Sequence, residues 1–279
     1  IILKKKFINS KKINFIYNLR NIDGVTGVII ASPANTHFRY AKFFLQKKIL
    51  VLLEKPICSN INQANILKKL SFKNNTSLII NYSDLFDPNF IKNLKLISHE
   101  LKTIKELKMN YGNNKNKYFF KKTITPSADW LPHPISIIIS ILKKIDNYQI
   151  IDYQFKVNSH DNQLFEMFKI KFIKKKITAI LNFSNFNKTN MRNIYLETQK
   201  MKFSFDAYNN KNNFFFKKKK YNFNLKMSSF ENITNTFLDI IKSKSFSTNI
   251  KLGIKEMTIT FSILKKIIHL RKKLKNEII

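Results

Sequence analysis

The sequence predicts an α/β protein, with a small parallel sheet covered by helices followed by a larger, mostly antiparallel open sheet. Residues 13–82 alternate helix and strand with short links, which is the pattern of a parallel sheet. Residues 150–224 instead alternate apolar and polar side chains, as strands with one buried face do. Two helical segments, at about 228–243 and 252–275, end the chain.

Short apolar runs separated by turn residues define the elements of the first region. The run Val25–Ala31 is continuously apolar, which is typical of a strand buried on both faces. Asn35 and Thr36 offer a cap for the next helix, and Ser59 or Asn60 offers one for the helix after it. In order, we expect a helix at 13–22, a strand at 25–31, a helix at about 37–47, a strand at 49–53, a helix ending near 70 and a strand at 77–81.

The pattern changes after Asp87-Pro88, where the second region begins. A helix near 89–97, a strand at 104–111, a polar loop through 122 and a helix from Pro126 to about Lys144 precede the alternating segment. The sequence therefore predicts two domains, residues 1–83 and 84–279, in which the final helices are able to pack back on the first.

Composition excludes several classes of protein and of site. A single cysteine, Cys58, excludes an internal disulfide and a multi-cysteine zinc site. Four glycines cannot form a G-x-G-x-x-G segment or a P-loop at their positions in this sequence. No apolar run approaches the ~18 residues that span a bilayer. We expect a cytoplasmic protein with no bound metal and no membrane association.

The formal charge of +34 allows two interpretations. A polyanion partner, nucleic acid or an anionic surface, is one of them. The other is a compositional bias toward lysine, which accompanies abundant Asn, Ile, Phe and Tyr, whereas arginine occurs at only four positions (20, 39, 192 and 271). Because base-specific DNA recognition depends on arginine, we favour the compositional interpretation and expect no specific nucleic acid partner.

Polar segments follow two consecutive strands of the predicted parallel sheet. The first reads S-P-A-N-T-H at residues 32–37, and the second reads E-K-P at residues 54–56. Ligands of such sheets bind beyond the carboxyl ends of the strands, and helix N-termini there donate amide hydrogens to phosphate. A binding edge and a pair of ordinary capped turns both fit this pattern.

These segments resemble the glucose–fructose oxidoreductase and inositol dehydrogenase (Gfo/Idh/MocA) family. The resemblance rests on residues 27–37, G-V-I-I-A-S-P-A-N-T-H, followed at the expected spacing by 51–56, V-L-L-E-K-P. It implies that the first domain is a truncated Rossmann-type domain and that the cofactor is NAD or NADP. The cofactor-binding residues that it implies are Ser32, Pro33, Asn35, His37, Glu54 and Lys55.

The same resemblance implies a catalytic pair on the helix that begins near Pro126. Asp129 and His133 are four residues apart and would share one helical face. In family terms His133 accepts the hydroxyl proton, Lys55 stabilises the developing alkoxide and contacts the substrate, and Asp129 orients His133 or the substrate. Two exposed groups at a helix start are the alternative. Trp130 either walls the substrate pocket or anchors the core.

The sequence also departs from the family pattern. The family's glycine-rich turn and first βα units have no counterpart here, so we expect a truncated gene product or a fragment. Pro134 follows the histidine where many relatives carry aspartate, and Asp84-Leu85 stands where many carry arginine. The resemblance implies oxidation of a hydroxyl on a sugar, cyclitol or nucleotide sugar, and a homo-oligomer formed through the open sheet face. A non-catalytic relative that keeps the fold is the alternative.

Overall fold

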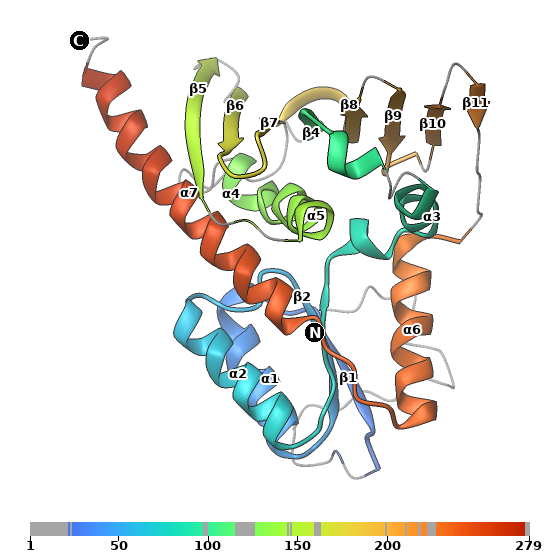
Figure 1. The fold of residues 1–279 in the computed structure, drawn as a ribbon. Coiled ribbons are helices and arrows are strands. Elements are labelled where there is room, and N and C mark those ends of the chain that lie inside the picture. Colours follow the sequence, from blue (N-terminus) through green and yellow to red (C-terminus); the bar gives the residue numbers. More distant parts are fainter. Residues whose placement is uncertain are drawn as a thin grey trace. The chain divides into compact units, whose positions relative to one another are not determined.

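A computed structural model describes residues 22, 24–96, 100–114, 126–143, 145, 147–158, 163–198, 200–209, 211–216, 219–221 and 227–276. The chain forms two compact units (Figure 1). The first contains the described residues before Tyr82 together with Phe237–Ile250, and the second contains Tyr82–Thr236 and the residues from Lys251 on. The helix expected at 13–22, except Ile22, and most of the polar loop ending at 122 lie outside the described residues.

The first unit has the parallel sheet that the sequence predicts. Its strands, β1 (Gly27–Ile30), β2 (Leu50–Glu54) and β3 (Leu78–Asn81), lie in that order. Helices α1 (Ala34–Gln46) and α2 (Ile61–Lys73) connect them and lie beside each other (Figure 1). β2 and β3 are buried in the core, but Ile29 of β1 is 49% exposed, so a first strand buried on both faces was a wrong prediction. Among the described strands β1 pairs only with β2, which leaves it at an edge.

The two helix starts of this unit differ in how well the sequence predicts them. Asn60 caps α2 as expected, because its side-chain oxygen accepts a hydrogen bond of 2.9 Å from the Gln63 amide. The cap predicted at Asn35 or Thr36 is wrong, because α1 begins at Ala34 with Pro33 at the N-cap. The fixed backbone angle of proline suits a position at the edge of a helix.

A segment distant in sequence lines the outer edge of β3. Thr248 forms a parallel bridge with Leu78 and donates its hydroxyl to the Leu78 carbonyl at 2.6 Å. The Asn249 side chain accepts from the Ile80 amide at 2.7 Å and donates to the Ile80 carbonyl at 2.9 Å. These bonds satisfy backbone groups that an edge strand would otherwise leave open.

The second unit is organised around an eight-stranded sheet with the order β11-β10-β9-β8-β4-β7-β6-β5. All neighbouring strands are antiparallel except β4 and β7, which pair in parallel. The mostly antiparallel sheet expected from the sequence is therefore confirmed. Its strands are β4 (Glu106–Asn114), β5 (Tyr148–Asn158), β6 (Gln163–Phe172), β7 (Ile177–Ser184), β8 (Phe186–Glu197), β9 (Met201–Asp206), β10 (Lys211–Phe216) and β11 (Lys219–Tyr221).

One face of this sheet packs against helices to form the main core (Figure 1). The core joins isoleucines of α5 and α7 to aromatic and aliphatic residues of the central strands. The helical elements of the unit are η2 (Ser83–Phe86), α3 (Pro88–Leu96), η3 (Glu100–Thr103), α4 (Pro126–Trp130), α5 (Pro132–Leu142) and α7 (Ile250–Asn276). Helix α6 (Ser229–Ser243) carries the chain from the second unit into the first.

The helix predicted from Pro126 to about Lys144 is two helices. α4 ends at Trp130, and α5 begins at Pro132. Pro132 and Pro134 have no amide hydrogen, so the helical hydrogen bonds that would cross this junction cannot all form. The Leu131 and Ile135 amides still bond to carbonyls four residues earlier, at 2.9 and 3.2 Å, so the two helices remain closely joined.

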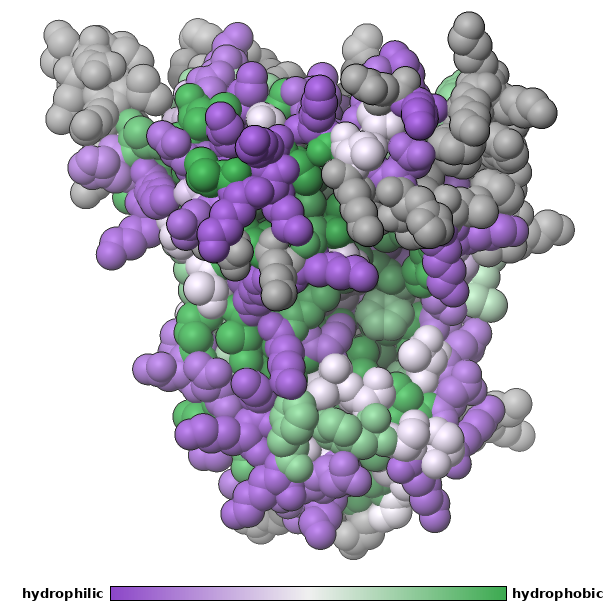
Figure 2. Space-filling view, in the orientation of Figure 1, coloured by the Kyte–Doolittle hydropathy of each residue, from purple (hydrophilic) through white to green (hydrophobic). Residues whose placement is uncertain are grey.

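Hydrophilic side chains are spread over the viewed surface of both units (Figure 2). Within the described part of the chain, no helix combines the length and apolarity needed to cross a membrane.

Candidate functional site

The carboxyl edge of the first unit brings polar side chains together. Glu54 and Asn81 are register partners at the ends of β2 and β3, and the Asn81 amide donates to a Glu54 carboxylate oxygen at 2.5 Å. Asn81 is 8% exposed, and its own side-chain oxygen is buried with no hydrogen-bond partner among the described residues. A buried acceptor without a donor is costly, so this edge is suited to a ligand that donates a hydrogen bond.

His37 ties together the two loops at this edge. The ring is 1% exposed, with Nδ1 2.7 Å from the Pro56 carbonyl oxygen and Nε2 2.8 Å from the Ser32 carbonyl oxygen. Carbonyl oxygens only accept, so both contacts are hydrogen bonds only when both ring nitrogens carry protons. His37 therefore fixes the backbone after β1 relative to the backbone after β2.

The other cofactor residues predicted in this unit lie around that histidine in the chain. The Ser32 hydroxyl is 2.6 Å from the Thr36 hydroxyl, which donates to the Pro33 carbonyl at 2.7 Å. Asn35 is exposed in the first turn of α1. Lys55 is half-buried and follows β2 directly. The structure thus places all six predicted cofactor residues at or next to the carboxyl ends of β1 and β2.

A second polar cluster lies in the other unit, around His133. This histidine is in the first turn of α5 and is 3% exposed, so the alternative that it is an exposed group is wrong. Its Nδ1 lies 3.3 Å from a carboxylate oxygen of Asp84 in η2. The distance is long for a charge-assisted hydrogen bond, which is about 2.8 Å, so we describe the contact as an electrostatic pair.

Asp84 is the centre of this cluster. It is 3% exposed; the Tyr111 hydroxyl donates to one carboxylate oxygen at 3.0 Å, and Arg192 Nη1 donates to the other at 3.3 Å. Burial by itself would raise the pKa of Asp84, but the interactions of the carboxylate with His133, Arg192 and Tyr111 lower that pKa to about 2. Burial and the nearby Asp84 charge hold the pKa of Tyr111 well above its usual value. Asp84 is thus an anion, and Tyr111 stays protonated as its donor.

Aromatic rings line the cluster on one side. The Trp130 ring centroid is 5.6 Å from that of His133 and 5.9 Å from that of Tyr111. The Arg192 guanidinium lies over the Trp130 ring at 5.1 Å from its centroid, a cation–π distance. Trp130 also packs against the main core, which is one of the two roles that the sequence left open. Its place in the wall of a substrate pocket stays a prediction.

Sequence reasoning identified His133 and Trp130 but missed the residues that surround them. Asp84 was noted only as a departure from the family pattern, although it is the carboxylate beside His133. Arg192 and Tyr111 come from β8 and β4, far away in sequence, and no local motif marks them. Asp129, expected to orient His133, is exposed in α4.

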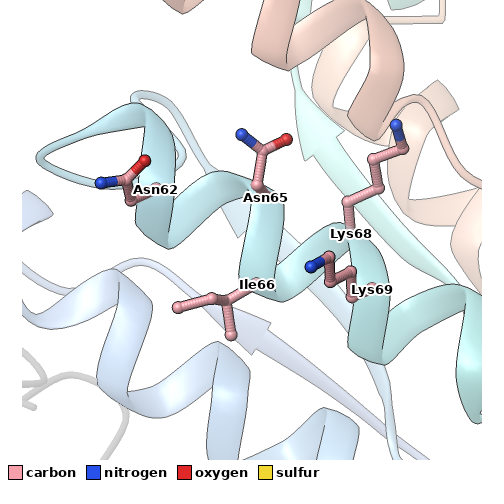
Figure 3. A pocket seen from close by; sticks show the side chains of 5 residues that line it. All are labelled: Asn62, Asn65, Ile66, Lys68 and Lys69. Atoms are coloured by element: carbon pink, nitrogen blue, oxygen red, sulfur yellow. The ribbon is translucent and has the colours of Figure 1, made fainter.

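A hollow in the described residues lies elsewhere, along α2 (Figure 3). It has a volume of about 500 Å³. In the close-up, Asn65 and Lys68 extend to one side of the helix and Ile66 to another. Its lining residues come from a single helix and are mostly exposed, so we do not assign it a chemical role: they are Asn62, Asn65, Ile66, Lys68 and Lys69.

No group of three or more His, Cys, Asp or Glu side chains in the described ranges is arranged to hold a metal ion. Cys58 is buried, and burial raises the pKa of its thiol to about 11, which makes it a poor nucleophile.

Comparison with known proteins places the first region in a family. Residues 4–82 match the Gfo/Idh/MocA family, described as an oxidoreductase family with an NAD-binding Rossmann fold. The match of this segment confirms the resemblance seen in the sequence and the class of cofactor expected from it.

A curated relative supports the same assignment over a limited length. Glucose-6-phosphate 3-dehydrogenase of Bacillus subtilis is 35% identical over 97 residues, which is 33% of this chain and 27% of that enzyme. The match thus spans about a quarter of the relative's length.

Solved structures extend the fold likeness to most of the chain. UDP-N-acetylglucosamine 3-dehydrogenase from Acidithiobacillus ferrooxidans is 16% identical with a TM-score of 0.67, over 86% of this chain and 77% of that one. An inositol dehydrogenase homologue from Azotobacter vinelandii, solved with NADH and myo-inositol, is 15% identical with a TM-score of 0.65, over 86% and 75% of the two chains. The predicted fold class is therefore confirmed.

Proposed function

We propose that this chain catalyses, or is part of a protein that catalyses, the reversible NAD(P)-linked oxidation of a hydroxyl on a sugar, cyclitol or nucleotide sugar. The observation that carries the proposal is the buried pair of His133 and Asp84, 3.3 Å apart, in a chain whose first region matches an NAD-binding oxidoreductase family. The printed activities of its relatives, on a sugar phosphate, a nucleotide sugar and an inositol, support the substrate class.

His133 is the general base in this proposal. Asp84 faces Nδ1 and stabilises the imidazolium that forms when the ring accepts the proton of the substrate hydroxyl. Oxidation of the alcohol removes that proton from oxygen and a hydride from carbon. The nicotinamide, when bound, supplies the hydride acceptor. In the reverse direction the protonated imidazole returns the proton to the alkoxide.

The cofactor would be held at the carboxyl edge of β1–β3. Glu54 and the open oxygen of Asn81 are acceptors that fit ribose or carboxamide donors. His37 would act by fixing the loops that carry the remaining groups. The family resemblance assigns Ser32, Pro33 and Asn35 to the same role. It also assigns Lys55 to stabilising the alkoxide, Asp129 to orienting the base or the substrate, and Trp130 to the substrate wall.

We also propose a homo-oligomer formed through the sheet face opposite the main core. Along β6 and β8 the core-facing residues are buried, and the alternate residues form that opposite face. Apolar members of it are Phe165, Met167 and Tyr195, of which Tyr195 is 40% exposed. Analytical ultracentrifugation tests this: Tyr195→Lys should shift an oligomer toward the monomer, and a monomeric wild-type chain contradicts the proposal.

The function is tested by following reduced nicotinamide with the full chain, NAD⁺ or NADP⁺, and three substrates: glucose 6-phosphate, myo-inositol and UDP-N-acetylglucosamine. Turnover that disappears in His133→Gln supports the proposal. Binding of a dinucleotide without turnover of any of the three, or turnover that survives in His133→Gln, contradicts it.

A non-catalytic relative is the second candidate, and the sequence observation that favours it is the lack of a glycine-rich phosphate loop among four glycines. Because Trp130 is the only tryptophan, energy transfer from it to bound NADH reports cofactor binding directly. Saturable transfer favours the dehydrogenase, whereas none favours a relative that has lost the cofactor.

A further inference from the structure

We propose that Arg192 binds an anionic group of the substrate, a phosphate or a carboxylate, beside the reacting hydroxyl. The inference rests on the proposed function and narrows its substrate class from sugars in general to acidic sugars. It is argued from residues of the second unit only.

The guanidinium of Arg192 is held in one orientation. Nη1 donates to the Ser83 hydroxyl at 3.1 Å and to Asp84 at 3.3 Å, and the central carbon of the group lies over the Trp130 ring. Held on two sides, the group loses little further freedom when a ligand binds, which makes it a preorganised partner.

The Nε and Nη2 edge of that guanidinium makes none of the contacts described above. In the part of the chain that the structure describes, the contacts of Arg192 use Nη1 or the central carbon, and none uses Nε or Nη2. The N–H groups on Nε and Nη2 point in parallel and match two oxygens of a carboxylate or phosphate. A neutral hydroxyl accepts from only one of them and brings no charge.

Exposure makes Arg192 the member of the cluster that solvent reaches. Its side chain is 27% exposed, whereas those of Asp84 and His133 are 3% and 4% exposed. Arg192 can therefore meet a ligand without disturbing the buried carboxylate below it.

Arg192 and His133 lie close together, so the anionic group bound by Arg192 and the hydroxyl that reacts at His133 can belong to one substrate molecule. The two side chains contact the two oxygens of one carboxylate, Asp84, and both lie next to Trp130. Two groups that share one carboxylate and one ring as neighbours are close enough for a single sugar-sized molecule to contact both. The formal charge of +34 adds a long-range attraction for any anion, so specificity must come from Arg192 itself.

Trp130 supplies a direct assay that needs no cofactor. It is the only tryptophan and lies 5.1 Å from the guanidinium, so its emission should change when a ligand occupies the free edge. We would titrate the full chain with glucose 6-phosphate, glucuronate and glucose. At least one acidic sugar should give a saturable change with a dissociation constant about tenfold or more below that of glucose.

Three variants separate recognition from general charge. Arg192→Gln should abolish the preference for the acidic sugar. Arg192→Lys keeps a positive charge beside Asp84, so it protects the fold while losing the two-pronged contact, and it should keep only part of the preference. Arg39→Gln removes the same charge from an exposed arginine that also lies on an aromatic ring, Tyr40 at 4.8 Å, and should behave as wild type.

The proposal is overturned if glucose binds as tightly as both acidic sugars, if neither acidic sugar gives a saturable change, or if a folded Arg192→Gln or Arg192→Lys chain keeps the full preference. The arms with glucose 6-phosphate and glucuronate decide between phosphate and carboxylate. The binding titration contains no dinucleotide, so it is independent of the activity assay. A preference in the titration, together with no turnover when NAD⁺ or NADP⁺ is supplied, contradicts the proposed function alone. Turnover with neutral and acidic sugars equally contradicts the role of Arg192 alone.

Discussion

The two buried histidines of this protein have contrasting surroundings. His37 in the first unit lies between two carbonyl oxygens, at 2.7 and 2.8 Å, from the ends of neighbouring strands. His133 in the second unit faces a carboxylate, 3.3 Å away, and is surrounded by aromatic rings. Both are at most 3% exposed, so burial does not distinguish them.

Their partners indicate different tasks. Two fixed carbonyl acceptors occupy both nitrogens of His37, which leaves none for a substrate and makes the ring a tie between loops. A carboxylate beside Nδ1 of His133 stabilises the charge that would follow proton uptake by the ring. Burial of a histidine therefore does not by itself indicate catalysis, and the carboxylate beside His133 is what supports the proposed role of that ring.

The largest expected effect is a loss of turnover when His133, and not a control histidine, is replaced. His133→Gln removes the proposed general base and should lower turnover about 10²–10⁴-fold, the usual contribution of such a group. The exposed His269→Gln in α7 is the matched control and should keep wild-type turnover. A loss of less than about fivefold in a folded His133→Gln chain would assign the base to another residue.

The next effect concerns the folding stability of the first unit. His37→Ala removes the ring that donates between these carbonyls and opens a cavity, so we expect the free energy of unfolding to fall by about 2–4 kcal/mol. Urea unfolding followed by circular dichroism measures this better than fluorescence, because the only tryptophan, Trp130, belongs to the second unit. His269→Ala should stay within about 0.5 kcal/mol of wild type. Equal stability of the two variants would mean that His37 does not stabilise the loops that follow β1 and β2.

Acid should remove the stabilisation that the Asp84 carboxylate gives to the folded chain. The pKa of Asp84 is lowered from 3.8 to about 2 in the folded chain, so the folded state binds fewer protons than the unfolded state in that range. The resulting stabilisation, of order 2 kcal/mol, is present above pH 4 and is lost as the pH falls through 2.

Asp84→Asn tests this window by urea unfolding at pH 5, 3 and 2. The stability difference from wild type should be largest at pH 5 and shrink toward pH 2. Asp239→Asn, at an exposed position of α6, should show no such trend. A difference that is independent of pH would mean that Asp84 is not held as an anion.

The smallest effect concerns one donor to that carboxylate. Tyr111→Phe removes the hydroxyl that donates to Asp84 at 3.0 Å, and we expect a loss of about 1–2 kcal/mol at neutral pH, since His133 and Arg192 remain. The midpoint of acid unfolding should also move to higher pH. An unchanged stability and midpoint would show that Tyr111 packs beside Asp84 without supporting its charge.

Much of the fold was predictable because it depends on local pattern. Strands β2 and β3, the cap of α2 by Asn60, and the two final helices lie within a few residues of where apolar runs and turn residues place them. The errors are also local in origin. Helix α1 begins directly after Pro33, three residues earlier than the sequence predicts, and two prolines divide the helix that begins at Pro126.

The sequence by itself determined the Rossmann-type segment, its polar strand ends and the histidine at the start of α5, because each is set by residues close together in the chain. Only the tertiary structure decided what surrounds that histidine: Asp84, Tyr111 and Arg192 come from η2, β4 and β8, and the pairing of those strands brings them together. It likewise decided that Thr248 and Asn249 line β3. Such contacts depend on long-range packing, which leaves no periodic signal in the sequence.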